Sequence, residues 1–204
     1  MKKILPFLTC FIGLSLFMMI GITQNAHSVP IVYTAILDGP SEDPPNASPG
    51  TGTALVVIDV EAHTLNVQAT FIDLIGTTTA AHIHAPTANP LSGNAGVATM
   101  VPSFLGFPLG VTSGTMDIFY DTTLASTFNP TFITSNGGTV ETAEAALAAY
   151  LAEGRAYFNI HTTSFPAGEI RGFLQPVPEP ATMLLLGSGL LGLVGYGRRK
   201  FSKK

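Results

Sequence analysis

The sequence predicts a mainly β fold: an antiparallel sandwich or barrel with one short helix, flanked by an N-terminal signal peptide and a C-terminal transmembrane helix. Three observations support this prediction. Residues 29–176 consist of short runs in which apolar and polar side chains alternate, separated by clusters rich in Gly, Pro, Asn and Thr. Residues 139–153 are Ala-rich and predict the helix, which ends at Gly154 because glycine adopts the left-handed conformation found after helices. Each end of the chain carries a long apolar run bordered by basic residues.

The alternating runs define the predicted strands. They are residues 31–37, 53–60, 65–74, 79–85, 97–101, 114–120, 155–162 and 169–175. In the third run Leu65 and Val67 share one face and the polar Asn66 lies on the other, because side chains alternate along a strand. Residues 39–52 are rich in proline, which cannot donate to a sheet, so they are predicted to form a loop. Residues 86–96 are a second predicted loop.

The N-terminal segment, residues 1–28, has the three parts of a secretory signal peptide. A positive region, an apolar run and a small-residue cleavage site follow one another as Lys2-Lys3, residues 4–22 and Ala26-His27-Ser28. We therefore expect signal peptidase to remove this segment and leave a domain that spans residues 29–176. Cys10, the only cysteine, leaves with the signal peptide, so the exported domain would contain no disulfide.

The C-terminal segment, residues 177–204, combines a proline-rich motif, an apolar run and a basic tail. These parts are Val177-Pro178-Glu179-Pro180, residues 181–197, and residues 198–204, which begin Arg198-Arg199-Lys200. The uncharged run has 17 residues. As a helix it would be about 25 Å long, enough to span a thin bilayer core. The basic tail is expected to stay cytoplasmic, which places the preceding domain outside the cytoplasm.

This order of parts resembles the PEP-CTERM sorting signal of Gram-negative bacteria. The resemblance implies recognition by an exosortase, cleavage near the proline-rich motif, and transfer to the cell surface or release beside exopolysaccharide. The alternative interpretation is a plain C-terminal anchor. In both cases the apolar run would hold the protein in the inner membrane before any processing.

The charge of the predicted domain differs from that of the whole chain. Residues 29–176 contain two basic residues, Arg155 and Arg171, against twelve acidic ones, so their formal charge is −10, compared with −4 for the chain. Nucleic-acid binding requires clustered cations that neutralise phosphates, so this composition excludes that function. An anionic polysaccharide would be bound only through neutral groups or divalent cations.

Three histidines are the strongest candidates for chemistry. His82 and His84 flank Ile83 on one predicted strand, and His161 follows Ile160 on a later one. If the apolar residues face the core, all three imidazoles lie on the outer face, where a loop could cover them. Converging imidazoles would bind Cu or Zn; the alternative is that each forms ordinary hydrogen bonds. Metal affinity is expected to fall below about pH 6.5, where free imidazole protonates.

Several short segments resemble the CHRD domain, a family named from repeats in chordin and also found in secreted bacterial proteins. They are residues 37–45, with Glu42-Asp43-Pro44-Pro45, then Gly50-Thr51-Gly52, His82-Ile83-His84, residues 157–162, and Pro166-Ala167-Gly168-Glu169-Ile170-Arg171-Gly172. Asp43 departs from the family, which usually has valine there. The resemblance implies an extracellular immunoglobulin-like β architecture and no established enzymatic activity. The leading interpretation is therefore an exported, non-enzymatic protein of the cell surface or extracellular matrix.

A second resemblance is limited to the two histidine-bearing strands. They are similar to the copper-ligand strands of copper–zinc superoxide dismutase, which implies copper ligation by His82, His84 and His161 and an anion-guiding role for Arg171. The departures from that family are large, because a bridging histidine is missing from residues 86–96 and the zinc cluster and disulfide cysteines are absent. A dinuclear enzyme is excluded on these grounds. A copper-binding, dismutase-like redox protein remains the alternative function.

No catalytic residue is predicted, because the chain has no Gly-x-Ser-x-Gly elbow and its cysteine lies in the signal peptide. Glu169 and Arg171 share a predicted strand face and are expected to form an ion pair. Three further acidic residues are expected to lie in a solvated loop, with calcium binding as the alternative: Asp38, Glu42 and Asp43.

Overall fold

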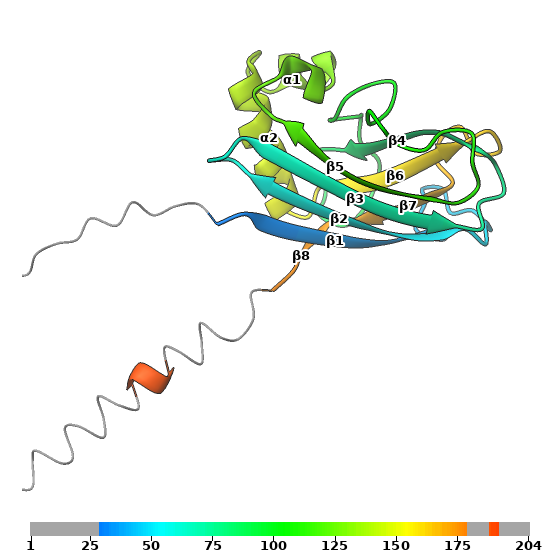
Figure 1. The fold of residues 1–204 in the computed structure, drawn as a ribbon, viewed down its shortest axis with the longest axis horizontal. Helices are drawn as coiled ribbons and strands as arrows, with labels where there is room; N and C mark the ends of the chain where they lie inside the picture. Colours follow the sequence, from blue (N-terminus) through cyan, green and yellow to red (C-terminus); the bar gives the residue numbers. More distant parts are fainter. Residues whose placement is uncertain (1–28, 179–187, 192–204) are drawn as a thin grey trace, which may run out of the picture.

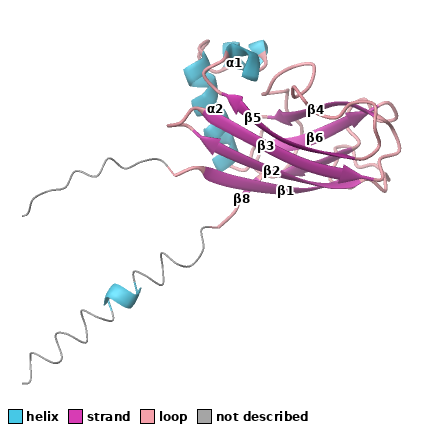
Figure 2. Ribbon diagram, viewed as in Figure 1, coloured by secondary structure: helices cyan, strands magenta, loops and turns pink. Residues whose placement is uncertain are grey.

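Antiparallel strands form one curled sheet in the computed structural model, which describes residues 29–178 and 188–191 (Figure 1). The strands are β1 (Ile31–Asp38), β2 (Thr51–Asp59), β3 (Thr64–Ile72), β4 (Thr78–His84), β5 (Gly114–Asp121), β6 (Tyr157–Thr162), β7 (Ile170–Phe173) and β8 (Gln175–Pro176). Their order is β4-β6-β7-β1-β2-β3-β5, with β8 paired to β1, and every pairing is antiparallel. The sheet curls so that β4 and β6 lie behind β3 in Figure 2. The predicted mainly β, antiparallel fold class is confirmed.

The hydrophobic core lies inside the curl. The inward side chains of β3 are buried as predicted, with Leu65 and Val67 fully inaccessible. From the opposite side of the curl Ile83, Phe158 and Ile160 also reach the core with no exposed surface. Burying each such side chain stabilises the fold by about 1.5–3 kcal/mol. The outer face of β4 and β6 is therefore the one that carries the polar residues.

The helices follow β5 and precede β6 in the chain. In space they cover one end of the sheet (Figure 1). The predicted helix is α2 (Val140–Ala152), which Thr139 begins with a capping box. Gly154 follows it with φ +68°, the left-handed conformation expected there. A second helix, α1 (Pro130–Ser135), was not predicted, because six residues are too few to show helical periodicity. The short 3₁₀ helix η1 (Ala125–Thr127) precedes it.

Two strand predictions need correction. Residues 97–101 form only isolated bridges, such as that of Val97 with His84, rather than a strand. Pro102 follows this run and has no N–H, so a ladder could not continue there. The predicted strand 169–175 is divided into β7 and β8, because between them Leu174 donates its N–H to the carbonyl of Ala156.

The two targeting segments fall mostly outside the described residues. The predicted signal peptide, residues 1–28, lies there, and so do Glu179, Pro180 and the basic residues Arg198, Arg199 and Lys200. Of the predicted membrane helix, residues 181–197, only 188–191 are described, and they are helical. Within the described part of the chain, no helix has the length and apolar character needed to span a membrane.

Candidate metal centre

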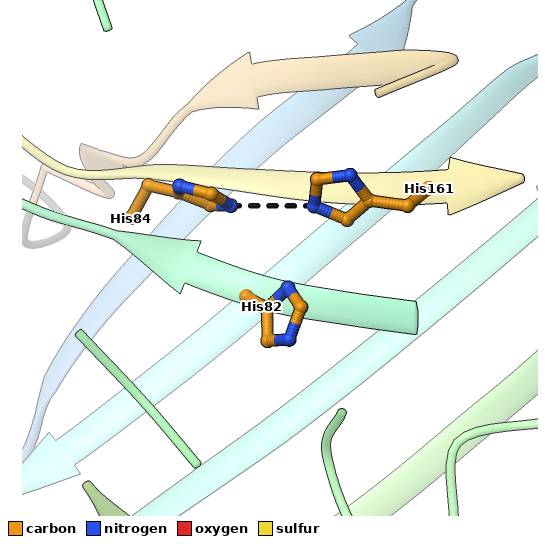
Figure 3. A group of neighbouring side chains, drawn as sticks. All are labelled: His82, His84 and His161. Atoms are coloured by element: carbon orange, nitrogen blue, oxygen red, sulfur yellow. Dashed lines mark hydrogen bonds between the residues drawn. The ribbon is translucent and has the colours of Figure 1, made fainter. Parts of the chain in front are cut away.

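Strands β4 and β6 bring the three predicted histidines together on the outer face of the sheet (Figure 3). The register pairs His84 with Tyr157 and His82 with Asn159, so His161 lies two residues further along β6, opposite Ala80. One ring nitrogen from each histidine lies within 4.8 Å of the others. The alternation along both strands therefore places the three histidines on one face, as the sequence predicted. The pairing register brings their rings close together.

Loops cover this face. His82 and His84 are only 6% and 8% exposed, although they point away from the core, and His161 is partly exposed. Part of the cover is the predicted loop at residues 86–96, which reaches His84 through Ala95. The rest was not expected: the chain beyond this loop brings Pro102 onto His82.

Each imidazole has one nitrogen tied to a backbone carbonyl. The three hydrogen bonds are His82 Nε2 to Pro102 O at 2.7 Å, His84 Nδ1 to Ala95 O at 2.9 Å, and His161 Nδ1 to Pro166 O at 3.0 Å. Because a carbonyl oxygen can only accept, these nitrogens carry the ring hydrogens in the neutral forms. The remaining nitrogens have free lone pairs: His82 Nδ1, His84 Nε2 and His161 Nε2. A carbonyl that fixes the tautomer in this way is the usual outer-shell partner of a metal-bound histidine.

The free nitrogens lack the partners that buried polar atoms normally have. His82 Nδ1 is buried and accepts no hydrogen bond within the described structure. His84 Nε2 and His161 Nε2 face each other at 3.4 Å. With both ring hydrogens on the Nδ1 atoms, this contact sets two lone pairs against each other. A cation between the nitrogens would remove both problems.

The protonation states favour ligation. The pKa values of His82 and His84 are lowered to about 4, mainly by burial, with a smaller lowering from the charge that protonated His161 would carry. Burial also lowers the pKa of His161. All three imidazoles are therefore neutral at pH 7, as metal binding requires. The lowered pKa values move the expected loss of metal affinity to solutions more acidic than about pH 6.5.

The geometry suits a small ion with little rearrangement. Cu and Zn bind imidazole nitrogen at about 2.0–2.1 Å, so two nitrogens on one ion lie about 3.4 Å apart in a tetrahedral site. The present limit of 4.8 Å requires the nitrogens to approach one another by at most about 1.4 Å. Among the described residues no Cys, Asp or Glu joins the group, which leaves a coordination position for solvent or a small ligand.

Comparison with known protein families agrees with this architecture. Residues 33–174 match the CHRD domain. The chain belongs to the CHRD-domain family. Residues 176–200 match the PEP-CTERM protein-sorting motif, so the CHRD protein is exported, directed to the cell surface and processed by an exosortase. No curated protein and no solved structure matches the chain.

The first loop of the CHRD domain differs from the prediction. Glu42 is buried, with 7% of its surface exposed, rather than solvated, and its Oε2 lies 3.8 Å from Nε of Arg171. Asp43 is exposed as expected. The predicted Glu169–Arg171 pair is wrong, because Glu169 precedes β7 and accepts hydrogen bonds from the hydroxyl of Ser48 and other donors instead.

Arg171 of the CHRD domain is also buried, with 3% of its surface exposed. Its guanidinium lies over the ring of Tyr157, 4.7 Å from the ring centroid. The anion-guiding role stays a prediction, and these contacts give it no support. Tyr157 itself was not predicted as a site residue, although it shares a strand face with His161; its ring stacks on that of His84 at 4.9 Å and 7°.

Proposed function

We propose that the exported CHRD protein is a non-enzymatic copper-binding protein of the cell surface. The ligands are His82 Nδ1, His84 Nε2 and His161 Nε2. The observation that carries this proposal is the convergence of three unprotonated nitrogens, two of them facing each other at 3.4 Å. Three neutral nitrogen donors suit both Cu and Zn, and the general order of divalent-metal affinities favours Cu.

The charge of the domain supports binding rather than turnover of an anion such as superoxide. Neither arginine of residues 29–176 is free to act as a surface cation: Arg155 pairs with Glu153 at 2.9 Å, and Arg171 is buried and donates to Ser41 O and Asn94 Oδ1. Neither is therefore left to attract an anion toward the site, and the net charge of −10 repels one. The same charge makes a divalent ion the natural bridge to an acidic exopolysaccharide.

The route to the surface completes the proposal. The apolar run at residues 181–197 holds the chain in the inner membrane while the domain folds outside the cytoplasm. An exosortase then cuts near Pro180 and releases the domain from its anchor. This order of events is supported by the match to the sorting motif and by the basic tail at the end of the chain, which favours a cytoplasmic location for that end.

Copper titration of the metal-free exported protein tests the site. The wild type is expected to bind one Cu(II) ion, and its electron paramagnetic resonance spectrum should show nitrogen ligands. Loss of an outer-shell partner costs a metal site about 10–100-fold, so removing a ligand in His161→Ala should cost at least about 100-fold. His63→Ala is the matched control, because His63 is 47% exposed and bonds to Glu144 rather than to the cluster.

Two results would contradict the proposal. One is a wild-type dissociation constant weaker than about 100 μM, an affinity that any exposed histidine could give. The other is an equal loss of affinity in His63→Ala and His161→Ala. Tighter binding of Zn than of Cu would keep the site but change the assigned metal.

A further inference from the structure

We propose that Arg171 is a positioning residue for the metal ligand His84, on which it acts through two routes that are joined where the Tyr157 hydroxyl contacts the backbone of Ala95. This inference rests on the proposed metal site. The side chain of Arg171 is 3% exposed, so it is not available as a surface cation. Its contacts instead lead in two directions, and both end at the ring of His84.

The first route passes through Tyr157. Strand β6 lies between β4 and β7, and the register sets Tyr157 opposite His84 on one side and opposite Phe173 on the other. The guanidinium of Arg171 lies 4.7 Å from the centre of the Tyr157 ring. The Tyr157 ring is in turn nearly parallel to that of His84, with 4.9 Å between centroids and 7° between planes. This contact limits the rotation of the His84 ring.

The second route passes through the loop at residues 86–96. Arg171 Nη1 donates to the side-chain oxygen of Asn94 at 2.7 Å and to the carbonyl of Gly93 at 3.3 Å. The next residue, Ala95, provides the carbonyl that accepts from His84 Nδ1 at 2.9 Å. Arg171 therefore holds the loop segment that determines which nitrogen of His84 carries the hydrogen.

Arg171 also holds the loop at residues 39–52. Its Nε donates to the carbonyl of Ser41 at 2.5 Å. Asn94 joins the two loops directly, since its side-chain amide donates to the carbonyl of Asp43 at 3.0 Å. One guanidinium thus links residues 41, 93 and 94, and the planar fork of arginine suits this task better than the single ammonium of lysine.

The chemical consequence concerns the tautomer of His84. If the Ala95 carbonyl moves away, the hydrogen of His84 can shift to Nε2. That atom is 3.4 Å from His161 Nε2, so the shifted form would make an ordinary N–H···N hydrogen bond. This bond would occupy both ligand nitrogens and compete with the metal. Arg171 keeps His84 in the tautomer that leaves Nε2 free.

Arg171→Lys in the exported protein tests this inference. The variant keeps the charge and loses the fork and the stacking surface. Copper affinity is expected to fall about 10–100-fold, the usual effect of losing an outer-shell partner. Arg155→Lys is the matched control, because Arg155 also lies over a tyrosine, 5.2 Å from the centre of the Tyr150 ring, and its Nε also donates to the loop at residues 86–96, but at Thr87 O, eight residues before Ala95. The control should bind copper like the wild type.

Nitrogen-15 NMR of the metal-free proteins gives a readout that does not depend on copper binding. The wild type and Arg155→Lys should show His84 with its hydrogen on Nδ1, and Arg171→Lys should show it partly or wholly on Nε2. If Arg171→Lys does not fold, Asn94→Ala replaces it, because Asn94 is exposed and breaks only the second route. An unchanged His84 tautomer in the folded variant would overturn the role of Arg171, even if the wild type binds copper. A shifted tautomer in a protein that binds no copper would support that role and overturn only the proposed function.

Discussion

Glu42 and Glu169 are two buried carboxylates whose pKa values shift in opposite directions. Burial raises the pKa of Glu42 to about 7, against the opposing effects of the Arg171 charge and the Asn159 amide. Burial alone would also raise the pKa of Glu169, but its hydrogen bonds outweigh that effect and lower it. The donors are the hydroxyls of Ser48 and Thr162 and the backbone N–H groups of Ile75 and Gly76. The number of donors therefore decides the sign of each shift.

The two shifts predict opposite pH dependences of stability. The ordinary pKa of a glutamic acid is 4.5, and that of Glu42 in the folded state is about 7. Between these two pH values the folded state holds a proton on Glu42 that the unfolded state has lost. The contribution of Glu42 to the free energy of unfolding therefore falls as pH rises through that window. Glu42→Gln removes this dependence, so its stability relative to the wild type should increase from pH 5 to pH 8. Urea unfolding at several pH values measures the difference.

Glu169→Gln is the control with the opposite sign. The folded-state pKa of Glu169 is lowered, so its contribution to stability is present above its ordinary value of 4.5 and is lost as pH falls below it. The variant should therefore be most destabilised at neutral pH and approach the wild type in acid. A Glu42→Gln difference that does not change with pH would show that Glu42 is ionised throughout.

At the scale of elements, the close approach of β7 to β1 positions the arginine. Gly172 follows Arg171 on β7, and a Cβ atom there would collide with the carbonyl oxygen of Ile36 on β1. A backbone oxygen cannot move aside as a flexible side chain can. The glycine therefore permits the contact between strands that brings Arg171 to the loops at residues 39–52 and 86–96.

Gly172→Ala is expected to lower the free energy of unfolding by about 1–3 kcal/mol, the usual cost of overpacking. Gly96→Ala is the matched control, because a Cβ atom at Gly96 would meet nothing within 4 Å. Urea denaturation of both variants measures the difference. Equal stability of the two variants would show that β7 and β1 separate at no cost, which the structure does not predict.

At the scale of the whole molecule, export is expected to remove the segments that carry most of the positive charge. The chain has nine basic residues, of which Arg155 and Arg171 lie in residues 29–176. The protein found outside the cell is expected to end near Pro180 and to carry the acidic domain alone. Mass spectrometry of this protein, from cells with and without the exosortase, tests the expectation. Intact Lys204 on extracellular protein would contradict this expectation. Glu179→Ala should reduce cleavage if the exosortase recognises the proline-rich motif.

The sequence by itself was sufficient where the information is local and periodic. Alternation placed Leu65 and Val67 inside the sheet and His82, His84 and His161 on one outer face. The composition of the C-terminal end indicated the sorting motif, and short motifs in the right order indicated the CHRD family, while the signal peptide at residues 1–28 stays a prediction. These features depend on a strand period of two residues or on contiguous segments, so no knowledge of the tertiary structure was needed.

Only the tertiary structure decided what surrounds the three histidines. The carbonyls of Ala95, Pro102 and Pro166, which fix the ring tautomers, come from loops whose closure no strand period predicts. The same holds for Glu42, which the sequence placed in solvent and the fold buried beside Arg171. Such partners lie far apart in the chain and meet because the sheet curls and its loops fold back over one face. Burial and the number of hydrogen-bond donors then determine which nitrogen is free and which carboxylate is charged, and both are properties of the folded chain.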